Sequence, residues 1–374
     1  MKKIRGLLYV IIAAVIIAAL AFFASTRTDS RRGAVTLWYV EEDTLAEAIK
    51  HQAGQYNSLS GRAGLPVELR AFETEEALAK AFEVSSPDLL LCTHLRAFSL
   101  DNREKLTDIA ALLSVSPNYS QKVLGRNACV GKSFFPVGFE IPLLVVNDSL
   151  CQKRGFDSLE AMLTEASGYT GKAGKPFFGC DSFSALFALT MLRSDKEFGA
   201  DLENESGKQY IDLYNLLARS AFEGSMYTGA ENCAQYVSAG ALPCAIVSSS
   251  ELAKLNTGGI SVFDVPAPIN YVNHDTLGTA IGLAVTNGGS RSTDDIAAFI
   301  SWLFEGGKCA EAALSAALAP AESAEYAADN AVSAALIDIT QTETVALTDS
   351  ESDYCANSES FDESFRCAME KLLP

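Results

Sequence analysis

Short, mostly apolar segments alternate with amphipathic ones from residue 34 onward, and this alternation restricts the fold more than any other feature. Between these segments, Thr44 and Thr74 are placed to cap helices, and Leu45, Ile49 and Ala53 recur at helical spacing. Strands that are apolar along their whole length belong in a parallel sheet covered on both faces. The pattern therefore predicts the α/β class. The first three expected strands are 34–40, 67–71 and 88–92.

The strand pattern returns in the second half of a chain of 374 residues, which is longer than one hydrophobic core usually supports. Asp157 and Glu160 have the spacing of a capping box, and Ser292 begins a segment with one apolar helical face. We therefore expect two α/β domains. The later strands are expected at 143–147, 245–248, 262–265 and 278–285.

The N-terminus predicts membrane targeting. Lys2, Lys3 and Arg5 precede an uninterrupted apolar run, Leu7–Ala24, which is long enough to cross a bilayer as one helix. Positive charge at its start predicts that the rest of the chain lies outside the cell. No cysteine precedes Cys92, so a lipid-anchored maturation is not expected. We interpret residues 1–32 as an uncleaved anchor in preference to a cleaved, secreted signal segment.

Charge argues against nucleic-acid binding. The chain has a formal net charge of −18, and without residues 1–32 it has 23 basic and 46 acidic side chains, a balance of −23. Such a surface repels phosphate backbones. We therefore expect no nucleic-acid partner.

The sequence shows no pattern typical of catalysis, and we expect no catalytic residue, metal or cofactor. Only three histidines are present, and HExxH, Cys-x-x-Cys, G-x-S-x-G and dinucleotide-binding patterns are missing from the sequence. The nine cysteines leave two possibilities open. Cys233 with Cys244 and Cys355 with Cys367 could form local disulfides, or most cysteines could be small buried side chains.

Several segments, taken in order, resemble the extracellular solute-binding proteins of ABC importers, particularly the sugar-binding type. FPVGFEIPLLVVNDSLCQKRGFDSLEAML, residues 135–163, carries the most specific resemblance. Its features are a proline-containing crossover, a strand ending in Asn-x-x-Leu and a helix start after a short loop. The other matching segments are VTLWYVEED (35–43), AFETEEALAKAF (71–82), SPDLLLC (86–92), VFDVPAPI (262–269) and LGTAIGLAVTN (277–287).

The resemblance implies a periplasmic-binding-protein-like (type II) fold with two lobes and hinge crossings, preceded by one transmembrane or signal helix. It implies lobe 1 from residues 33–139 and 266–288, and lobe 2 from 140–265 and 289–374. Crossings are expected near 138–142, 264–268 and 287–290. The implied function is capture of a small ligand, a sugar, between the lobes and its delivery to an ABC permease.

Ligands of open α/β sheets bind beyond the carboxyl ends of strands, so residues at strand ends are the candidate contacts. Trp38 and Tyr39 can stack on a sugar face, whereas Trp302 is interpreted as a packing residue. Glu140 lies in the first crossover and is the carboxylate that we most expect to contact the ligand. The predicted ligand-binding residues are Trp38, Tyr39, Glu41, Glu73, Thr93, His94, Glu140, Asp181, Ser182, Tyr227, Ser249, Ser250 and Asn273.

Other functions remain open on the same fold. Convergent tyrosines and carboxylates would suit ferric iron, and acidic clusters would suit a polyamine. An anchored sensor or interaction protein without a transport role is a further alternative, and an extracellular enzyme is the weakest.

Overall fold

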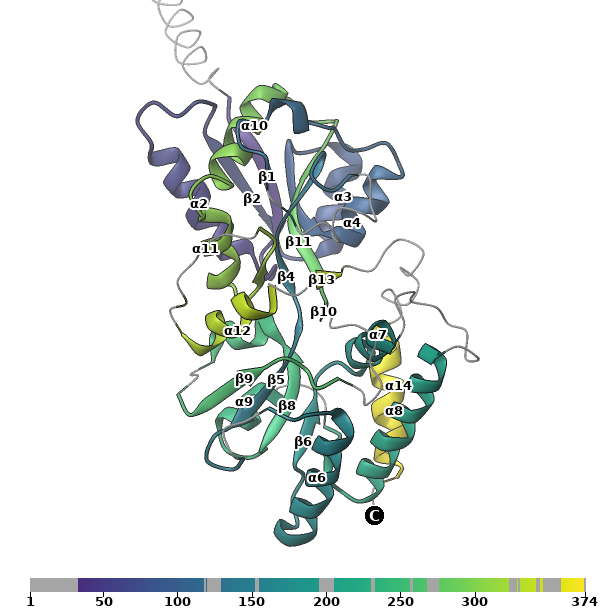
Figure 1. Cartoon of the computed structure of the whole chain (residues 1–374). Coiled ribbons are helices and arrows are strands. Elements are labelled where there is room, and N and C mark those ends of the chain that lie inside the picture. Colours follow the sequence, from purple (N-terminus) through teal and green to yellow (C-terminus); the bar gives the residue numbers. More distant parts are fainter. Residues whose placement is uncertain are drawn as a thin grey trace, which may run out of the picture.

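The protein consists of two lobes, each built on its own β-sheet (Figure 1). Residues 1–32, the expected membrane segment, and Asn273 lie outside the described residues. Within the described residues, no helix combines the length and the hydropathy needed to span a membrane. The computed structural model describes residues 33–117, 119, 129–151, 155–194, 205–229, 233–255, 258–267, 276–322, 328, 330–340, 344–345 and 358–372.

Lobe 1 has a six-stranded sheet in the order β12-β4-β11-β3-β1-β2. Strands β1, β2 and β3 are parallel, as the continuous apolar runs predicted, and β11 is antiparallel to both β3 and β4. At a register shift in β11, an added Cβ on Gly282 would lie 2.2 Å from the carbonyl oxygen of Phe135, so only glycine fits there. The strands are β1 (Val35–Val40), β2 (Val67–Phe72), β3 (Leu89–Thr93), β4 (Phe134–Glu140), β11 (Thr279–Val285) and β12 (Ala319–Pro320).

Helices cover the lobe 1 sheet on both faces (Figure 1). Thr74 caps α3 by accepting a hydrogen bond from the amide of Ala77, as predicted, and Ser292 caps α10 in the same way. The predicted cap at Thr44 is wrong, because α2 starts after Leu45 without a side-chain cap. The helices are α2 (Ala46–Ser58), α3 (Glu75–Val84), α4 (His94–Asp101), the 3₁₀ turn η1 (Ala110–Leu112), α10 (Thr293–Leu303) and α11 (Lys308–Ser315).

A buried carboxylate joins three segments of lobe 1. Asp88 is fully buried just before β3, and its Oδ2 accepts hydrogen bonds from the amide (2.7 Å) and hydroxyl (2.8 Å) of Thr36 in β1. Its Oδ1 accepts a third from the amide of Arg291 (3.0 Å), ahead of α10. The Thr36 hydroxyl in turn accepts from the Asp88 amide (3.0 Å). This network fixes the edge of the lobe farthest from lobe 2.

Lobe 2 has a five-stranded mixed sheet in the order β7-β6-β8-β5-β9. Helix α6 is capped by Ser158, one residue after the predicted Asp157, because the Ser158 hydroxyl accepts from the amide of Ala161. The strands are β5 (Pro142–Asn147), β6 (Phe178–Cys180), β7 (Met226–Tyr227), β8 (Cys244–Ser248) and β9 (Ile260–Phe263). The helices are α6 (Leu159–Ala173), α7 (Phe183–Ser194), α8 (Glu205–Phe222), α9 (Cys233–Ser238), the 3₁₀ helix η2 (Ser249–Lys254) and α14 (Ser358–Glu370).

The C-terminal helix α14 packs beside α7 and α8 (Figure 1). Phe187 of α7 is fully buried, and its ring lies 5.5–5.6 Å from the rings of Phe361 and Phe365 in α14. Burying such side chains stabilises the lobe by roughly 2 kcal/mol each. The end of the chain therefore completes the core of lobe 2.

Three connections join the lobes, and the third differs from the expected one. Ile141 alone separates β4 in lobe 1 from β5 in lobe 2, and residues 264–278 lead back from β9 to β11. Residues 287–290 do not cross, since they form the turn between β11 and α10 within lobe 1. The chain instead leaves lobe 1 after β12 for α12 (Ala331–Thr340), which packs against both β12 and β9.

The expected assignment of residues 289–322 to lobe 2 is therefore wrong. Helices α10 and α11 pack on α2, and β12 pairs with β4 in the lobe 1 sheet. Their apolar side chains, including Phe299 and Leu303, belong to the lobe 1 core. Two small strands, β10 (Thr276–Leu277) and β13 (Thr344–Val345), pair in parallel near the second connection.

No disulfide bond joins the described cysteines, of which seven are buried and Cys367 is exposed. Of the two possibilities that the sequence left open, the structure therefore has buried thiols and not a bridge between Cys233 and Cys244; Cys355 lies outside the described residues. Burial raises the pKa of Cys180, Cys244 and Cys309 well above the usual value for a thiol. These cysteines act as small apolar core residues.

Candidate ligand-binding site

The carboxyl ends of the strands in both sheets meet at the junction of the lobes. Strands β1, β2 and β3 are parallel, and β4 runs in the same direction because β3 and β4 are both antiparallel to β11. These four strands of lobe 1 therefore end at the same edge of the sheet. In lobe 2, β6 and β8 are parallel, and the last residue of β8, Ser248, pairs with Pro142 beside the first connection. Both sheets therefore present the strand ends at which α/β proteins bind ligands.

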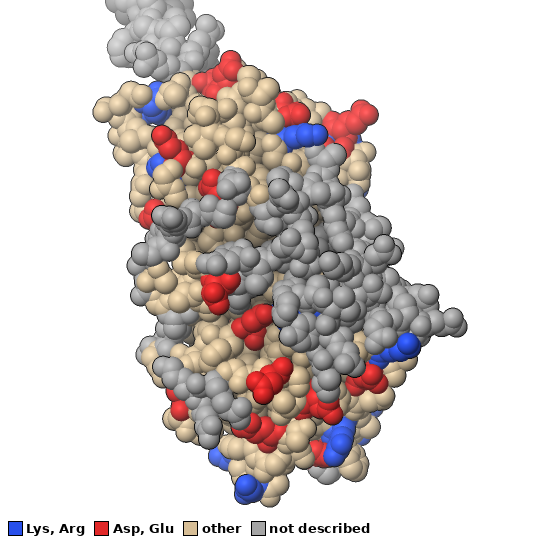
Figure 2. All heavy atoms as spheres, in the orientation of Figure 1, with Lys and Arg blue, Asp and Glu red and all other residues tan. Residues whose placement is uncertain are grey.

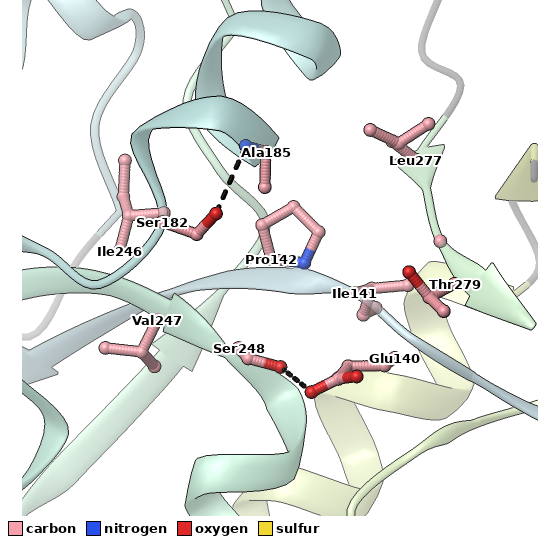
Figure 3. A pocket seen from close by; sticks show the side chains of 11 residues that line it. Glu140, Ile141, Pro142, Ser182, Ala185, Ile246, Val247, Ser248, Leu277 and Thr279 are labelled. Atoms are coloured by element: carbon pink, nitrogen blue, oxygen red, sulfur yellow. Dashed lines mark hydrogen bonds between the residues drawn. The ribbon is translucent and has the colours of Figure 1, made fainter. Parts of the chain in front are cut away.

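A cavity of about 250 Å³ lies at this junction (Figure 3). Both sheets contribute to its lining, together with the N-terminal turn of α7 and the end of the second connection. Among the lining residues that the structure describes there is no lysine or arginine. The lining consists of Glu140, Ile141, Pro142, Ser182, Ala185, Ile246, Val247, Ser248, Leu277, Gly278 and Thr279.

Among the described residues of this lining, Glu140 is the one ionisable side chain, and two serines hold its carboxylate. Its Oε1 accepts hydrogen bonds from the hydroxyl of Ser248 at 2.5 Å and from that of Ser250. Among the described residues no hydrogen bond is donated to Oε2. Glu140 therefore combines a fixed orientation with an oxygen available to a ligand hydroxyl or ammonium group.

Asp362 of α14 fixes the other wall of the cavity. Its Oδ1 accepts a hydrogen bond from the amide of Ser184 (2.6 Å), and its Oδ2 accepts from the hydroxyls of Ser182 (3.2 Å) and Ser184 (3.1 Å). A carboxylate is favourable at this position, the N-terminus of α7, because the helix dipole is positive there. The Ser182 hydroxyl also accepts a hydrogen bond from the amide of Ala185 (3.2 Å), so two partners fix its orientation in the lining.

Trp38 and Tyr39 do not reach the cavity, which corrects the prediction that they stack on a ligand. Only 4% of Trp38 and 5% of Tyr39 is exposed. The Trp38 ring packs on Phe72 (centroids 5.0 Å apart) beneath the Arg70 guanidinium, and Lys50 lies over the Tyr39 ring. Both rings are inaccessible because β1 is covered on both faces.

His94 and Ser249 are likewise buried and structural. The Nδ1 atom of His94 accepts a hydrogen bond from the amide of Ala280 in β11 (3.1 Å). The Ser249 hydroxyl accepts from the amide of Ile141 (3.2 Å), while the Ser249 amide donates to the carbonyl of Ile141 (2.8 Å). His94 thus binds the backbone of β11 and Ser249 binds that of the first connection. Neither side chain lines the cavity.

None of the remaining predicted residues that the structure describes lines the cavity, although Ser250 donates a hydrogen bond to Glu140. Glu41 and Glu73 are exposed after β1 and β2, and Thr93 is half-buried at the end of β3. Asp181 accepts a hydrogen bond from the amide of Cys233 (3.1 Å). A hydrogen bond with Tyr236 raises the pKa of Tyr227 to about 12, so the Tyr227 phenol stays neutral at physiological pH.

Two polar lining residues were missing from the prediction. Ser248 ends a strand that the sequence did predict, so the strand-end argument could have found it. Thr279 begins β11 and lines the cavity because β11 runs against its neighbours, a direction that the sequence pattern does not reveal. Within the described residues, no group of three or more His, Cys, Asp or Glu side chains is arranged to hold a metal ion.

Comparisons with known proteins identify the architecture. No protein-family model matches the chain, and no curated protein sequence does. A similar solved structure is the cyclic α-maltosyl-1,6-maltose binding protein of Arthrobacter globiformis. It has a TM-score of 0.70 and 13% identity, with 91% of this chain and 96% of that one covered.

Two further structures bind different ligands. The GacH receptor of Streptomyces glaucescens, determined unliganded and with acarbose, gives a TM-score of 0.68 and 16% identity, covering 91% of this chain and 92% of that one. The spermidine/putrescine substrate-binding protein of Streptococcus pneumoniae gives a TM-score of 0.60 and 12% identity, covering 89% of this chain and all of that one. The chain therefore has the two-lobed α/β fold of ABC-importer substrate-binding proteins.

Proposed function

We propose that this protein is an extracellular solute-binding protein, without catalytic activity, that captures a carbohydrate between its lobes and delivers it to an ABC importer. The observation that carries the proposal is the cavity at the junction of the lobes, in which one oriented carboxylate and three hydroxyl residues accompany apolar side chains. Sugars present hydroxyl groups and apolar ring faces, which such a lining can hydrogen-bond and cover.

Sugar binders among the similar structures support this choice, since their ligands include maltose, acarbose and β-D-galactopyranose. The alternative ligand that a specific observation favours is a polyamine, because Glu140 could pair with an ammonium group and a spermidine/putrescine binder shares the fold. Figure 2 shows more acidic than basic side chains on the face in view, which would also attract a cation.

A ligand panel separates these possibilities. Protein lacking residues 1–32 is heated with maltose, galactose, acarbose, spermidine, an amino-acid mixture or ferric citrate, and unfolding is followed by circular dichroism. A compound that binds only the folded state, present at about 100 times its Kd, should stabilise the protein by about 2.7 kcal/mol. A higher unfolding temperature with a sugar supports the proposal. A rise with spermidine or ferric citrate alone would contradict it, and no rise with any compound would favour the sensor alternative.

We also propose that residues 1–32 anchor the protein to the outer face of the cell membrane. The support is the sequence alone: basic residues followed by the apolar run 7–24, with no lipobox cysteine. In a bacterial host, the full-length chain should remain with membranes after carbonate washing and be digested by protease added to whole cells. Recovery of a shortened chain in the medium would show cleavage and contradict anchoring.

A further inference from the structure

Arg193, near the end of α7, places a cation inside lobe 2. Its side chain is only 3% exposed, although arginine is among the residues least often buried. A buried guanidinium is costly unless its donors find acceptors with good geometry. The partners that Arg193 binds therefore indicate what the residue does.

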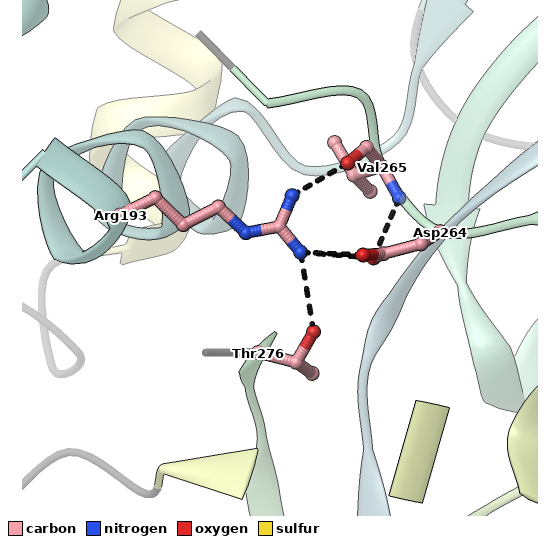
Figure 4. Close-up of polar contacts among 4 residues, drawn as sticks. All are labelled: Arg193, Asp264, Val265 and Thr276. Carbon is pink, nitrogen blue, oxygen red and sulfur yellow. Dashed lines mark hydrogen bonds and ion pairs between the residues drawn. The ribbon is translucent and has the colours of Figure 1, made fainter. Parts of the chain in front are cut away.

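These partners belong to the second connection between the lobes (Figure 4). The Nη2 atom donates to both carboxylate oxygens of Asp264, at 2.9 and 2.8 Å, and Nη1 donates to the carbonyl oxygen of Val265 at 2.6 Å. Asp264 also accepts a hydrogen bond from the amide of Val265 at 2.8 Å. One planar guanidinium thus holds the backbone as it leaves β9.

Arg193 also contacts the residue at which the chain enters β10. Its Nη2 lies 3.4 Å from the hydroxyl of Thr276, a longer contact than the others. Thr276 is directly followed by Leu277, Gly278 and Thr279, which line the cavity, and Thr279 begins β11 in the lobe 1 sheet. The helix that carries Arg193 contributes Ala185 to the same cavity.

We propose that Arg193 is a positioning residue for the hinge: by clamping Asp264, Val265 and Thr276 to α7, it sets the angle at which the two lobes meet. The first connection is the single residue Ile141, about which the lobes can turn. The second connection links β9 of lobe 2 to β11 of lobe 1, so small changes in it would alter the angle between the lobes. The inference depends on the two-lobed fold and not on the identity of the ligand.

The test measures the distance between the lobes without ligand. A spin label is attached to Cys367 of α14, which is exposed, and a second to cysteine introduced by Val84→Cys on α3, where the side chain is 88% exposed. Cys355→Ser removes a further cysteine, and the other cysteines are buried. Pulsed electron paramagnetic resonance then gives the distribution of distances between the two spin labels. Arg193→Met, which keeps the aliphatic stem but removes the guanidinium, should shift and broaden this distribution.

Arg219→Met is the matched control, since it removes an exposed guanidinium paired with Glu223 in the same lobe, and should leave the distribution unchanged. If Arg193→Met does not fold, Arg193→Lys and Asp264→Ala replace it; lysine keeps the charge but lacks the planar set of donors. Asp264 is 43% exposed, so its removal should be tolerated. A lower unfolding temperature with an unchanged distribution would show that Arg193 only stabilises lobe 2, and would overturn the proposal.

Discussion

Replacing Glu140 with alanine is expected to raise the Kd for the ligand roughly 30- to 150-fold. A hydrogen bond to a charged group contributes about 2–3 kcal/mol, and each 1.4 kcal/mol corresponds to a factor of ten in Kd. Glu140 lines the cavity, and two serine hydroxyls orient its carboxylate. The loss should therefore fall on binding rather than folding. Isothermal titration with the compound that stabilises the protein most measures it.

Two further variants make this experiment specific. Glu83→Ala removes an exposed acidic side chain on α3, outside the cavity, and should leave the Kd unchanged. Ser250→Ala removes one of the two hydroxyls that orient the Glu140 carboxylate, so its effect should be smaller than that of Glu140→Ala. A Kd that is the same in wild-type protein and Glu140→Ala would remove Glu140 from the binding site.

Asp88→Ala is expected to lower the free energy of unfolding of lobe 1 by about 3–4 kcal/mol. The change removes the fully buried carboxylate that accepts from the amides of Thr36 and Arg291 and from the hydroxyl of Thr36, which is half-buried. Each unsatisfied buried donor costs about 1–3 kcal/mol. Urea denaturation followed by tryptophan fluorescence is suitable, because the chain has two tryptophans and both Trp38 and Trp302 belong to lobe 1.

Asp88→Asn provides the comparison. The asparagine side-chain oxygen can still accept from Thr36, whereas its amide nitrogen would face the Arg291 amide, which is also a donor. The loss should therefore be smaller than in Asp88→Ala. Equal midpoints for wild-type protein and Asp88→Ala would mean that water or a rearranged backbone satisfies these donors, and would refute the structural role assigned to Asp88.

Local sequence patterns predicted several strands well, because their signals are local, but missed β4 and β6. The segments of β1, β2, β3 and β5 are bounded by polar or turn-forming residues, and the structure has these strands within one residue of the expected limits. The same holds for the cap at Thr74, whose partner is three residues away. Trp302 is a packing residue as expected, with its ring stacked on Phe299.

Pairings between distant segments limited the prediction of the site. Trp38 stands near the end of an apolar strand, but whether its ring is exposed depends on Arg70 and Phe72 in the neighbouring strand. His94 looked like a strand-end ligand, and its actual partner, Ala280, is 186 residues away. The third connection was placed at 287–290 by resemblance alone, and the alanine-rich segment around β12 has little hydrophobic periodicity to correct it. Only tertiary contacts assign it to lobe 1.

The order of strands in the two sheets has a consequence for synthesis. The lobe 2 sheet draws all its strands from one continuous stretch, β5 to β9, which is complete once residue 263 has been made. In lobe 1, by contrast, β3 acquires its second neighbour only when β11 has been made, and β12 follows later still. Closing such long loops before their contacts form is slow. The lobe that leaves the ribosome first is thus the one that must wait longest for its missing strands.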